Sequence, residues 1–485
     1  MKYMHLSITE LHELLVSKKV TPLELTKEAI ELAKNNDDNA FEYICEKEAL
    51  EFAATLVEPE VDNLIWGIPF VLKDNFATKD IPTTGSSDIL KDYVPIFSSE
   101  VATRLTNNKA VLIGKTTLDE LAMGGTGTTG HLGISYNPWD PTHTRYVGGS
   151  SCGSAICGAA GIVPFAIGSD TGDSVRKPAS YAGLVGFKPT WGRISRWGLF
   201  PFATSMDHVA YFTRNVVDSA LLLNVLAGRD DKDSTSSNKP VENYLEGISN
   251  NIEGKKIAVI KEIYDCLKDK ELIEAFDKSI ENLKAKGAIV DFVSMDGKLL
   301  LAIYPTYMII SCSEATSNNA CLDGIKYGLR ESGETYQEIM TNTRKKGFSE
   351  LIRRRFVIGS YSLLKDNQKE LFLRAQKARR LIVDAVNKIL ESYDAIYTPA
   401  STTVAPKFSD TMDKTSNQYL IGENHLGIAN FAGLPSITLP IYMQNGLPFG
   451  ANLTAGAFNE KTLFNLALNL EDTTGLRNIV AKEDK

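Results

Sequence analysis

Long apolar runs are missing from this 485-residue chain. No stretch of about 18 apolar residues occurs, so the composition predicts no membrane-spanning segment. Residues 1–7 are not followed by an apolar segment, and a secretory signal peptide is therefore not expected. These absences predict a cytoplasmic protein with no membrane contact.

Cysteine and histidine are scarce, with six of each. The cysteines are scattered and no CxxC pair occurs, which argues against a disulfide framework and predicts reduced thiols. No group of His, Cys and Glu residues has the spacing of metal ligands. We therefore predict no metal and no cofactor in this chain.

An excess of basic residues is also missing. The net charge is -8, whereas a surface that binds nucleic acid is usually basic. Any nucleic acid in the pathway of this protein should therefore be held mainly by a partner. The hydrophobic content of 43% and the charged content of 23% are ordinary for a globular protein.

Helical signals dominate the first 60 residues. Ser7 with Glu10 and Thr21 with Glu24 form two predicted capping boxes, the second with proline at the first helical position. Beyond this segment, strand and helix patterns alternate, which predicts an α/β fold with a mixed sheet. Strands are expected at 68–72, 110–114, 163–167, 256–260 and 288–293, helices at 155–161, 272–283 and 368–392, and a hairpin at Asn445-Gly446.

Two loops rich in glycine and serine carry Ser150 and Ser174, and Lys73 ends an apolar strand upstream. A catalytic serine needs a base and backbone N–H groups that stabilise an oxyanion. Glycine-rich turns can supply the N–H groups, and a buried lysine can supply the base if burial lowers its pKa by about 3 units. The three motifs read Gly67-Ile-Pro-Phe-Val-Leu-Lys-Asp-Asn75, Gly148-Gly-Ser-Ser-Cys-Gly-Ser154 and Gly168-Ser-Asp-Thr-Gly-Asp-Ser174.

In the order of these three residues and the gap between the two serines, the chain resembles the amidase signature family, over almost its whole length. Within that family it is most similar to the glutamine-hydrolysing A subunits of aspartyl/glutamyl-tRNA amidotransferases. The segments that carry this narrower resemblance are Gly114-Lys-Thr-Thr-Leu-Asp-Glu-Leu-Ala-Met123, Asp323-Gly-Ile-Lys-Tyr-Gly328 and Asn430-Phe-Ala-Gly-Leu-Pro435. The resemblance implies one domain, with a helical segment (1–60) packed on a signature domain (61–485) whose twisted mixed sheet is covered by helices on both faces.

The resemblance also implies a Ser–cisSer–Lys triad. Ser174 would be the nucleophile, Lys73 the base, and Ser150 would pass a proton between them. The oxyanion hole would be formed by the backbone N–H groups of Thr171, Gly172, Asp173 and Ser174. The residues implied to hold the α-carboxylate and α-amino groups of glutamine are Tyr307, Arg355 and Glu423. From residue type alone, the basic run 353–355 could equally be a solvated helix face.

Departures from the family pattern concern the nucleophile loops. Asp173 stands where the family usually has glycine, and Cys152 also replaces a usual glycine. A carboxylate beside an oxyanion hole would oppose the developing charge, so we expect the Asp173 side chain to point away. Asp170 and Arg176 are expected to pair and hold the loop, whereas Lys115 and Lys188 are expected to be structural.

Two other motifs indicate different chemistry. Residues 125–130 match GxGxxG, but no strand precedes them and prolines follow, which argues against a dinucleotide site. Residues 149–153 match GxSxG with Ser151 as nucleophile, but residues 145–147 are a poor strand. Because His208 and His425 lie downstream, a Ser-His-Asp site stays open at this point.

The implied function is glutamine hydrolysis, which supplies ammonia for converting Glu-tRNA(Gln) or Asp-tRNA(Asn). The partners implied are a B subunit, which would bind ATP, Mg²⁺ and most of the tRNA, and a small C subunit in a heterotrimer. Two alternatives are a free-standing amidase that acts on small amides and a scaffold subunit whose catalysis Asp173 impairs.

Overall fold

The computed structural model describes residues 1–481, and one mixed sheet runs through them. Its 11 strands follow the order β1-β3-β2-β4-β6-β5-β10-β11-β9-β7-β8. The strands are β1 (Phe41–Ile44), β2 (Pro69–Lys73), β3 (Val111–Thr116), β4 (Phe165–Asp170), β5 (Val185–Lys188), β6 (His208–Thr213), β7 (Lys256–Ile260), β8 (Ile289–Val293), β9 (Ala395–Pro399), β10 (Ser436–Gln444) and β11 (Leu447–Ala455). The predicted α/β class with a mixed sheet is confirmed.

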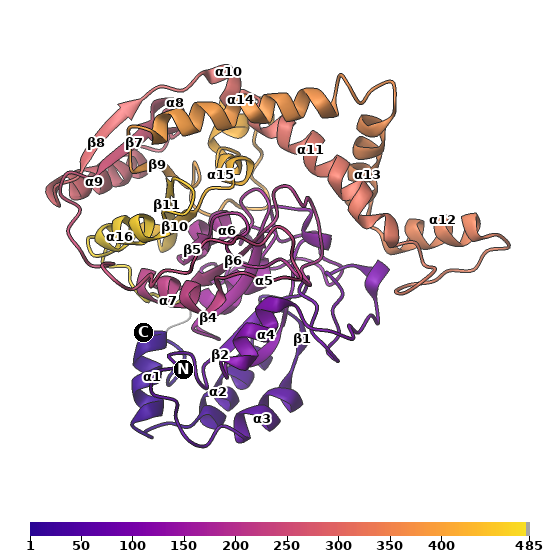
Figure 1. The fold of residues 1–485 in the computed structure, drawn as a ribbon, viewed down its shortest axis with the longest axis horizontal. Helices are drawn as coiled ribbons and strands as arrows, with labels where there is room; N and C mark the ends of the chain where they lie inside the picture. Colours follow the sequence, from indigo (N-terminus) through magenta and orange to yellow (C-terminus); the bar gives the residue numbers. More distant parts are fainter. Residues whose placement is uncertain (482–485) are drawn as a thin grey trace.

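Helices cover both faces of this sheet (Figure 1). On one face, α5 packs on β2 and β4, and α6 packs on β5, β10 and β11; α7, α9 and α16 pack on the other. The α-helices are α1 (Ile8–Val16), α2 (Pro22–Lys34), α3 (Glu46–Ala54), α4 (Glu100–Asn107), α5 (Cys152–Ala159), α6 (Arg176–Ala182), α7 (Val216–Leu226), α8 (Lys261–Tyr264), α9 (Lys270–Ala285), α10 (Gly297–Leu301), α11 (Ile303–Asn318), α12 (Tyr336–Gly347), α13 (Glu350–Leu363), α14 (Phe372–Leu390), α15 (Gly427–Ala432) and α16 (Glu460–Glu471). Short turns of other helix types are η1 (Asp88–Leu90), η2 (Glu120–Ala122), η3 (Asn319–Cys321) and η4 (Gln418–Gly422).

The N-terminal segment is mostly helical, and both capping boxes form. Ser7 accepts from the backbone N–H of Glu10, Thr21 accepts from that of Glu24, and each glutamate reaches back to its cap. The helical prediction missed β1, which pairs antiparallel with β3 at the edge of the sheet. All four residues of this strand are only partly buried, so its sequence lacks the clear alternation that marks a strand.

The stretch Gly297–Cys321 is the one part of residues 1–481 that is long and apolar enough to cross a membrane by length and composition. Its main helix, α11, packs against α13 and α14. Ile310, Cys312 and Ala315 of α11 are fully buried in this packing. The length and composition of this stretch are thus accounted for by a helix in the protein interior.

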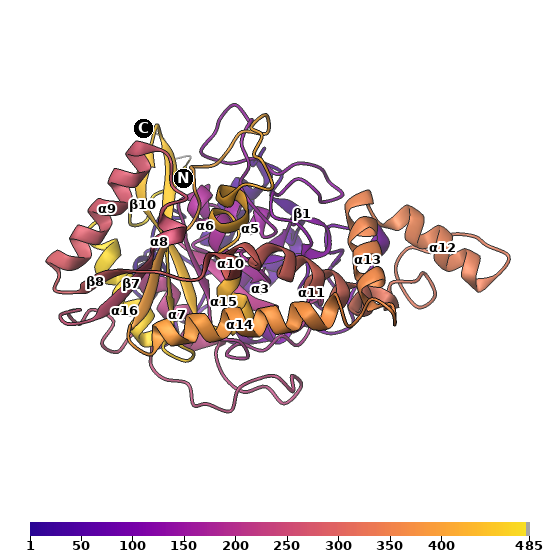
Figure 2. The same cartoon turned by 90° about the horizontal axis from the view of Figure 1, so that it is seen from above.

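Helices α11 to α14 extend away from the sheet, with α12 at the far tip from β8 and α9 in both views (Figures 1 and 2). The prediction placed the start of the long helix at 368, but α14 begins at Phe372. The predicted hairpin forms between β10 and β11, with Asn445 and Gly446 both at positive φ. A two-residue turn of this kind requires positive φ at both positions, which asparagine and glycine tolerate best.

Candidate active site

Parallel pairing brings the lysine motif and the nucleophile loop to one edge of the sheet. Strands β2 and β4 are parallel, with Leu72 paired to Ile167. The carboxyl ends of parallel strands lie at the same edge, where α/β proteins place their binding sites. Lys73 therefore lies beside the loop that follows Asp170, although about a hundred residues of sequence separate them.

Lys73 is fully buried and its ammonium group is surrounded by serines. Its Nζ donates to Ser150 Oγ at 2.8 Å, to Ser151 Oγ at 2.9 Å and to Ser169 Oγ at 3.0 Å. The peptide bond between Gly149 and Ser150 is cis. The structure thus brings Lys73 and Ser150 into direct contact, as the resemblance implied.

Burial lowers the pKa of Lys73 to about 7, because the charged form loses its hydration. Cys152 and the carboxylates of Asp119, Asp170 and Asp207 oppose that shift from farther away. Since hydroxyls rather than a carboxylate contact the amine, no ion pair restores the ordinary pKa. A neutral amine at physiological pH can accept a proton from a serine hydroxyl.

Donors with no partner line the loop between β4 and α6. The backbone N–H groups of Thr171, Gly172, Asp173 and Ser174 donate no hydrogen bond to any residue in 1–481. The hydroxyl of Ser174 is likewise unpaired within the described chain, and Ser174 is only 4% exposed. Unsatisfied donors are rare in buried positions, so this cluster is well suited to stabilising an oxyanion.

Asp170 and Arg176 pair and hold this loop, as expected. Arg176 Nη2 lies 2.9 Å from Asp170 Oδ1 and donates to the Gly172 carbonyl at 2.7 Å. Asn430 joins them, since its Nδ2 donates to the Asp170 carbonyl at 3.0 Å. Asp170 Oδ2 also accepts from the backbone N–H of Val175 at 3.0 Å. These contacts fix the carbonyls of the loop away from the free N–H groups.

Tyr307 from α11 and Arg355 from α13 lie next to the loop. A Cβ on Gly172 would lie 3.0 Å from Tyr307 Cε2, so glycine lets the phenol pack closely over the loop. Phe202 connects the two, with its ring centroid 6.5 Å from that of Tyr307 and 5.8 Å from the Arg355 guanidinium. Nε and Nη1 of Arg355 are buried and have no partner in residues 1–481. Arg355 is thus turned inward rather than solvated, and it presents free donors to an anion.

Glu423 lies at the end of η4, where Lys177 of α6 contacts it. Lys177 Nζ donates to Glu423 Oε2 at 2.8 Å. Burial disfavours the charged carboxylate, but Lys177 and Thr402 outweigh burial and lower the pKa of Glu423 to about 2. The acid on this side of the site is therefore ionised.

Asp173 and Cys152, the two departures from the family pattern, are both accommodated. Asp173 is not among the residues with positive φ, so its backbone does not require glycine. Its carboxylate is turned toward Lys177, with Oδ2 at 3.7 Å from Nζ. Cys152 is the first residue of α5, and burial raises the pKa of its thiol to about 11. That thiol therefore stays protonated beside the lysine.

The GxGxxG motif wraps around a carboxylate of the protein itself. Asp119 Oδ2 accepts from Thr126 N at 3.1 Å and Gly127 N at 3.0 Å, while Oδ1 accepts from Thr128 N and Thr129 N at 3.1 and 3.2 Å. The Asp119 backbone N–H donates to the Ser150 carbonyl at 3.1 Å. With neither a preceding strand nor a following helix, this loop supports the Ser150 loop instead of binding a dinucleotide.

Neither downstream histidine contacts Ser151. The hydroxyl of Ser151 donates to the Ser169 carbonyl at 3.1 Å and accepts from Lys73. His208 Nδ1 lies 2.6 Å from the Met206 carbonyl, and both ring nitrogens of His425 face backbone carbonyls. Burial holds the pKa of each imidazole well below its usual range. The Ser-His-Asp alternative therefore has no base next to its serine.

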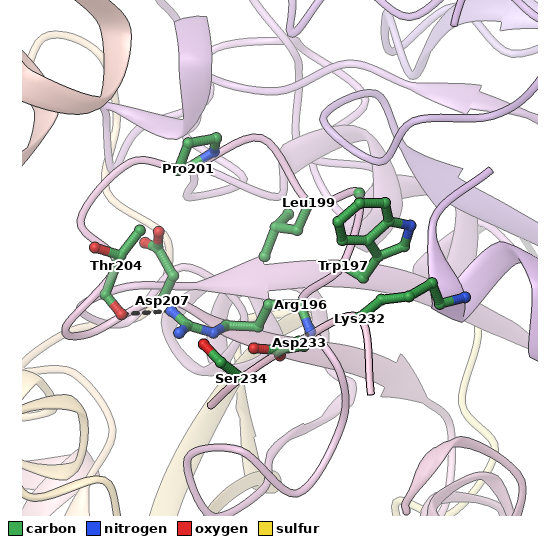
Figure 3. A pocket seen from close by; sticks show the side chains of 10 residues that line it. Arg196, Trp197, Leu199, Pro201, Thr204, Asp207, Lys232, Asp233 and Ser234 are labelled. Atoms are coloured by element: carbon green, nitrogen blue, oxygen red, sulfur yellow. Dashed lines mark hydrogen bonds between the residues drawn. The ribbon is translucent and has the colours of Figure 1, made fainter. Parts of the chain in front are cut away.

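A cavity of about 220 Å³ has Asp207 in its wall (Figure 3). Asp207 Oδ1 accepts from Thr171 Oγ1 at 2.6 Å, so this residue connects the cavity wall to the nucleophile loop. Arg196, Trp197 and Lys232 also line the cavity. None of the residues predicted for catalysis or substrate binding lines it.

Three residues that the sequence analysis did not single out belong to this site. Ser169 contacts Lys73, Asp119 supports the Ser150 loop, and Lys177 joins Asp173 to Glu423. The spacing of Asp173 and Lys177, four residues apart at a helix start, is a signal for an ion pair that the sequence does carry. The other two contacts depend on segments far apart in the chain.

Comparisons with known proteins show the family of this chain. The Amidase family model matches residues 24–464. The chain is 39% identical over 480 residues to the glutamyl-tRNA(Gln) amidotransferase A subunit of Streptococcus mutans, covering 98% of this chain and 97% of that one. The corresponding protein of Lactiplantibacillus plantarum is 37% identical over 479 residues, with the same coverage. The crystal structure of the A subunit from Thermotoga maritima superposes with a TM-score of 0.79 at 34% identity, covering 98% of this chain and 96% of that one. Matching in sequence along nearly its whole length and in fold, the chain belongs to the amidase family.

Proposed function

We propose that this protein is the glutamine-hydrolysing subunit of a tRNA-dependent amidotransferase. The observation that carries the chemistry is a buried lysine, with a pKa of about 7, beside a serine loop with unpaired N–H groups. The full-length similarity to glutamyl-tRNA(Gln) amidotransferase A subunits supports glutamine as the amide. Together these features favour an amide hydrolase that uses Ser174, Ser150 and Lys73.

In the first step, the unpaired Ser174 hydroxyl turns to donate to Ser150 Oγ; neutral Lys73 then takes the proton of Ser150 while Ser150 takes that of Ser174. Ser174 Oγ attacks the side-chain amide carbon of glutamine, and the amide oxygen becomes an oxyanion. The unpaired N–H groups of residues 171–174 stabilise that charge without having to reorganise. The proton then returns through Ser150 to the leaving nitrogen, and ammonia departs.

In the second step, water attacks the glutamyl ester on Ser174. The same relay accepts a proton from the water, and glutamate leaves with the serine hydroxyl restored. One lysine thus acts as base in both halves, because it is neutral again each time the leaving group has taken the proton.

The amino-acid end of glutamine lies between α11, α13 and α6 in this proposal. Arg355 offers two buried, unpaired donors to the α-carboxylate, and Tyr307 lies over Gly172 beside the nucleophile loop. Glu423 is the acidic residue that the family resemblance assigns to the α-amino group. Its charge has the right sign, since its pKa is held near 2.

The ammonia would be used by a partner B subunit, which binds ATP, Mg²⁺ and most of the tRNA, with a C subunit completing a cytoplasmic heterotrimer. The net charge of -8 fits a chain that leaves tRNA binding to a partner. We also propose that residues 1–60 and 61–485 fold as one domain, in which β1 adds to the common sheet; the last four residues of that range lie outside the described residues.

Glutaminase activity, measured with and without the B and C subunits, tests this function. We expect glutamate release by the purified complex and a lower rate for the isolated chain. Rapid hydrolysis of simple amides by the isolated chain, with no turnover of glutamine in either form, would instead favour a free-standing amidase. An intact complex that hydrolyses neither would identify a scaffold subunit.

A further inference from the structure

The carboxylate of Glu423 is already saturated by the protein. Oε1 accepts from the backbone N–H of Thr402 at 2.9 Å and also from the Thr402 hydroxyl. Oε2 accepts from Lys177 Nζ at 2.8 Å and from the Tyr181 hydroxyl at 3.5 Å. The side chain is only 11% exposed. A substrate ammonium would have to displace one of these donors to reach Glu423.

Lys177 lies between two acids and cannot neutralise both. Its Nζ is 2.8 Å from Glu423 Oε2 and 3.7 Å from Asp173 Oδ2, and it also donates to the Glu423 carbonyl. Burial alone would lower the pKa of Lys177, but Glu423 and Asp173 outweigh burial and raise it. Two carboxyl groups thus share one ammonium group, and burial raises the pKa of the Asp173 carboxyl while Lys177 opposes that shift.

Asp173 is the acid with room for another cation. Its side chain is 25% exposed, and its only charged partner within residues 1–481 is Lys177, at the long distance of 3.7 Å. Within the described chain, no donor lies closer to its carboxylate than this Lys177 ammonium at 3.7 Å. It precedes the proposed nucleophile directly and follows Gly172, over which Tyr307 lies. Asp173 is therefore the less completely paired acid of the cluster and the one more open to a further cation.

The other side of the site has the opposite charge. Arg355 carries two buried donors with no partner in residues 1–481, and the charge of its guanidinium acts on the Tyr307 phenol, as does that of Asp173. Within the described chain, a cation with two unpaired donors and an incompletely paired acid thus both act on the same tyrosine. This arrangement is complementary to an amino acid in its zwitterionic form, with carboxylate toward Arg355 and ammonium toward Asp173.

We propose that Asp173 binds the α-ammonium group of the amide substrate, and that Glu423 acts only through Lys177 by holding Asp173 in place. This inference rests on the proposed function and names a substrate-binding residue within it. Asp173 then also makes catalysis selective for amides that carry an α-amino group. The carboxylate beside the oxyanion hole opposes the developing charge unless a substrate ammonium compensates it, so amides without an α-amino group react slowly.

The test compares two substrates in the assembled amidotransferase: glutamine and desamino-glutamine, the monoamide of glutaric acid. For Asp173→Asn, we expect kcat/KM for glutamine to fall by about tenfold to a hundredfold, through the loss of a charged hydrogen bond. For desamino-glutamine the same substitution should leave kcat/KM unchanged or raise it several-fold. The two substrates should thus respond in opposite directions or by very different factors.

Glu423→Gln is the matched control. This side chain keeps its length but replaces one acceptor oxygen with an NH₂ group that cannot accept from Thr402 or Lys177. Because Glu423 does not contact the substrate in this proposal, we expect kcat/KM for both substrates to fall by a similar factor. The inference is overturned if Asp173→Asn lowers both amides equally, or if Glu423→Gln rather than Asp173→Asn removes the preference for glutamine. It is also overturned if Asp173→Asn improves glutamine turnover, since Asp173 would then only oppose the oxyanion.

Binding separates failure of this inference from failure of the proposed function. Calorimetric titration of the Ser174→Ala chain with glutamine and with desamino-glutamine reads the preference without turnover. If the wild-type complex does not hydrolyse glutamine but this chain binds glutamine about tenfold more tightly than desamino-glutamine, and Asp173→Asn abolishes the difference, the function is wrong and the inference holds. Equal binding of both compounds to the Ser174→Ala chain contradicts the inference whatever the activity.

Discussion

Two fully buried lysines on neighbouring parallel strands have opposite surroundings in this protein. On β2, Lys73 donates to three serine hydroxyls. On β3, Lys115 Nζ lies 3.1 Å from Asp74 Oδ1 and donates to the Thr83 hydroxyl at 2.7 Å and the Phe76 carbonyl at 2.9 Å. Both are equally removed from water, and only the second has a carboxylate in contact.

This difference shows how one fold can leave one buried lysine available as a base and hold another as a structural cation. Burial lowers the pKa of both lysines, and for Lys115 the charge of Asp74 opposes that shift. Hydroxyls satisfy the hydrogen bonds of Lys73 without stabilising its positive charge to the same extent. The partner, rather than the depth of burial, therefore decides which lysine can take part in acid–base chemistry.

The largest effect is expected from Ser174→Ala, which removes the nucleophile from the Lys73 region. We expect glutaminase activity to fall by about 10⁴-fold or more, because the remaining groups cannot form an acyl-enzyme. The melting temperature should change little, since the hydroxyl has no partner to lose within the described chain. Ser151→Ala, measured in parallel, should retain activity; the reverse pattern would make Ser151 the nucleophile.

The second largest effect is expected from Lys73→Met. Glutaminase activity should fall by about 10²- to 10⁴-fold, as expected when a general base is removed. The side chain is similar in length and apolar, so the buried site should tolerate it. Steady-state glutaminase kinetics at neutral pH provide the measurement. Substantial activity in Lys73→Met would contradict a lysine base.

Lys115→Met is the counterpart on β3 and should affect stability instead of chemistry. It leaves the Asp74 carboxylate buried and unpaired, which costs about 3–5 kcal/mol of unfolding free energy. Denaturant unfolding should report that loss, while kcat of the folded protein changes little. The double substitution Lys115→Met, Asp74→Asn should recover part of the stability; without any recovery, the ion pair would not be what Lys115 contributes.

Ser169→Asp should place a carboxylate beside Lys73, like the one beside Lys115. Its effect on glutaminase activity should be smaller than that of Lys73→Met. In the wild type, activity should rise as pH passes through about 7, because Lys73 must lose its proton to act as base. The apparent pKa of this rise belongs to the coupled group of Lys73, Ser150 and Ser174 rather than to Lys73 alone. A carboxylate in contact should raise the pKa of Lys73 by about 1–3 units. The rise in activity then moves to higher pH, and the rate at neutral pH falls by about tenfold or more. Ser169→Asn is the uncharged control, and an equal shift in both variants would mean that the charge is not the cause.

Much of the fold was predicted from the sequence because the local patterns of apolar and turn-forming residues agree with the elements that the tertiary structure contains. Strand β7 matches the predicted 256–260, and the turn at Asn445 and Gly446 forms as its residue types require. The edge strand β1 was not predicted from the sequence, because it is short and partly exposed and depends on pairing with β3.

Part of the candidate site was also predicted from the sequence, but from a family resemblance and loop motifs rather than from the periodicity of apolar residues. The positions of Lys73, Ser150 and Ser174 followed from a resemblance and from glycine-rich loops, which carry their own conformational signal. The pairing of Lys177 with both Asp173 and Glu423 joins α6 to a turn far along the chain. Nothing local to Glu423 indicates that its carboxylate is already occupied.

By itself the sequence determined the class of fold, the capped N-terminal helices, the hairpin and the reactive residue types. These depend on propensities and periodicities within a few residues, where each side chain acts on its own backbone. The tertiary structure decided which buried lysine meets hydroxyls and which meets a carboxylate. It also decided which of the two acids beside Lys177 is the more exposed. Such choices depend on desolvation and on charges brought together from distant segments, and those energies do not exist until the chain is folded.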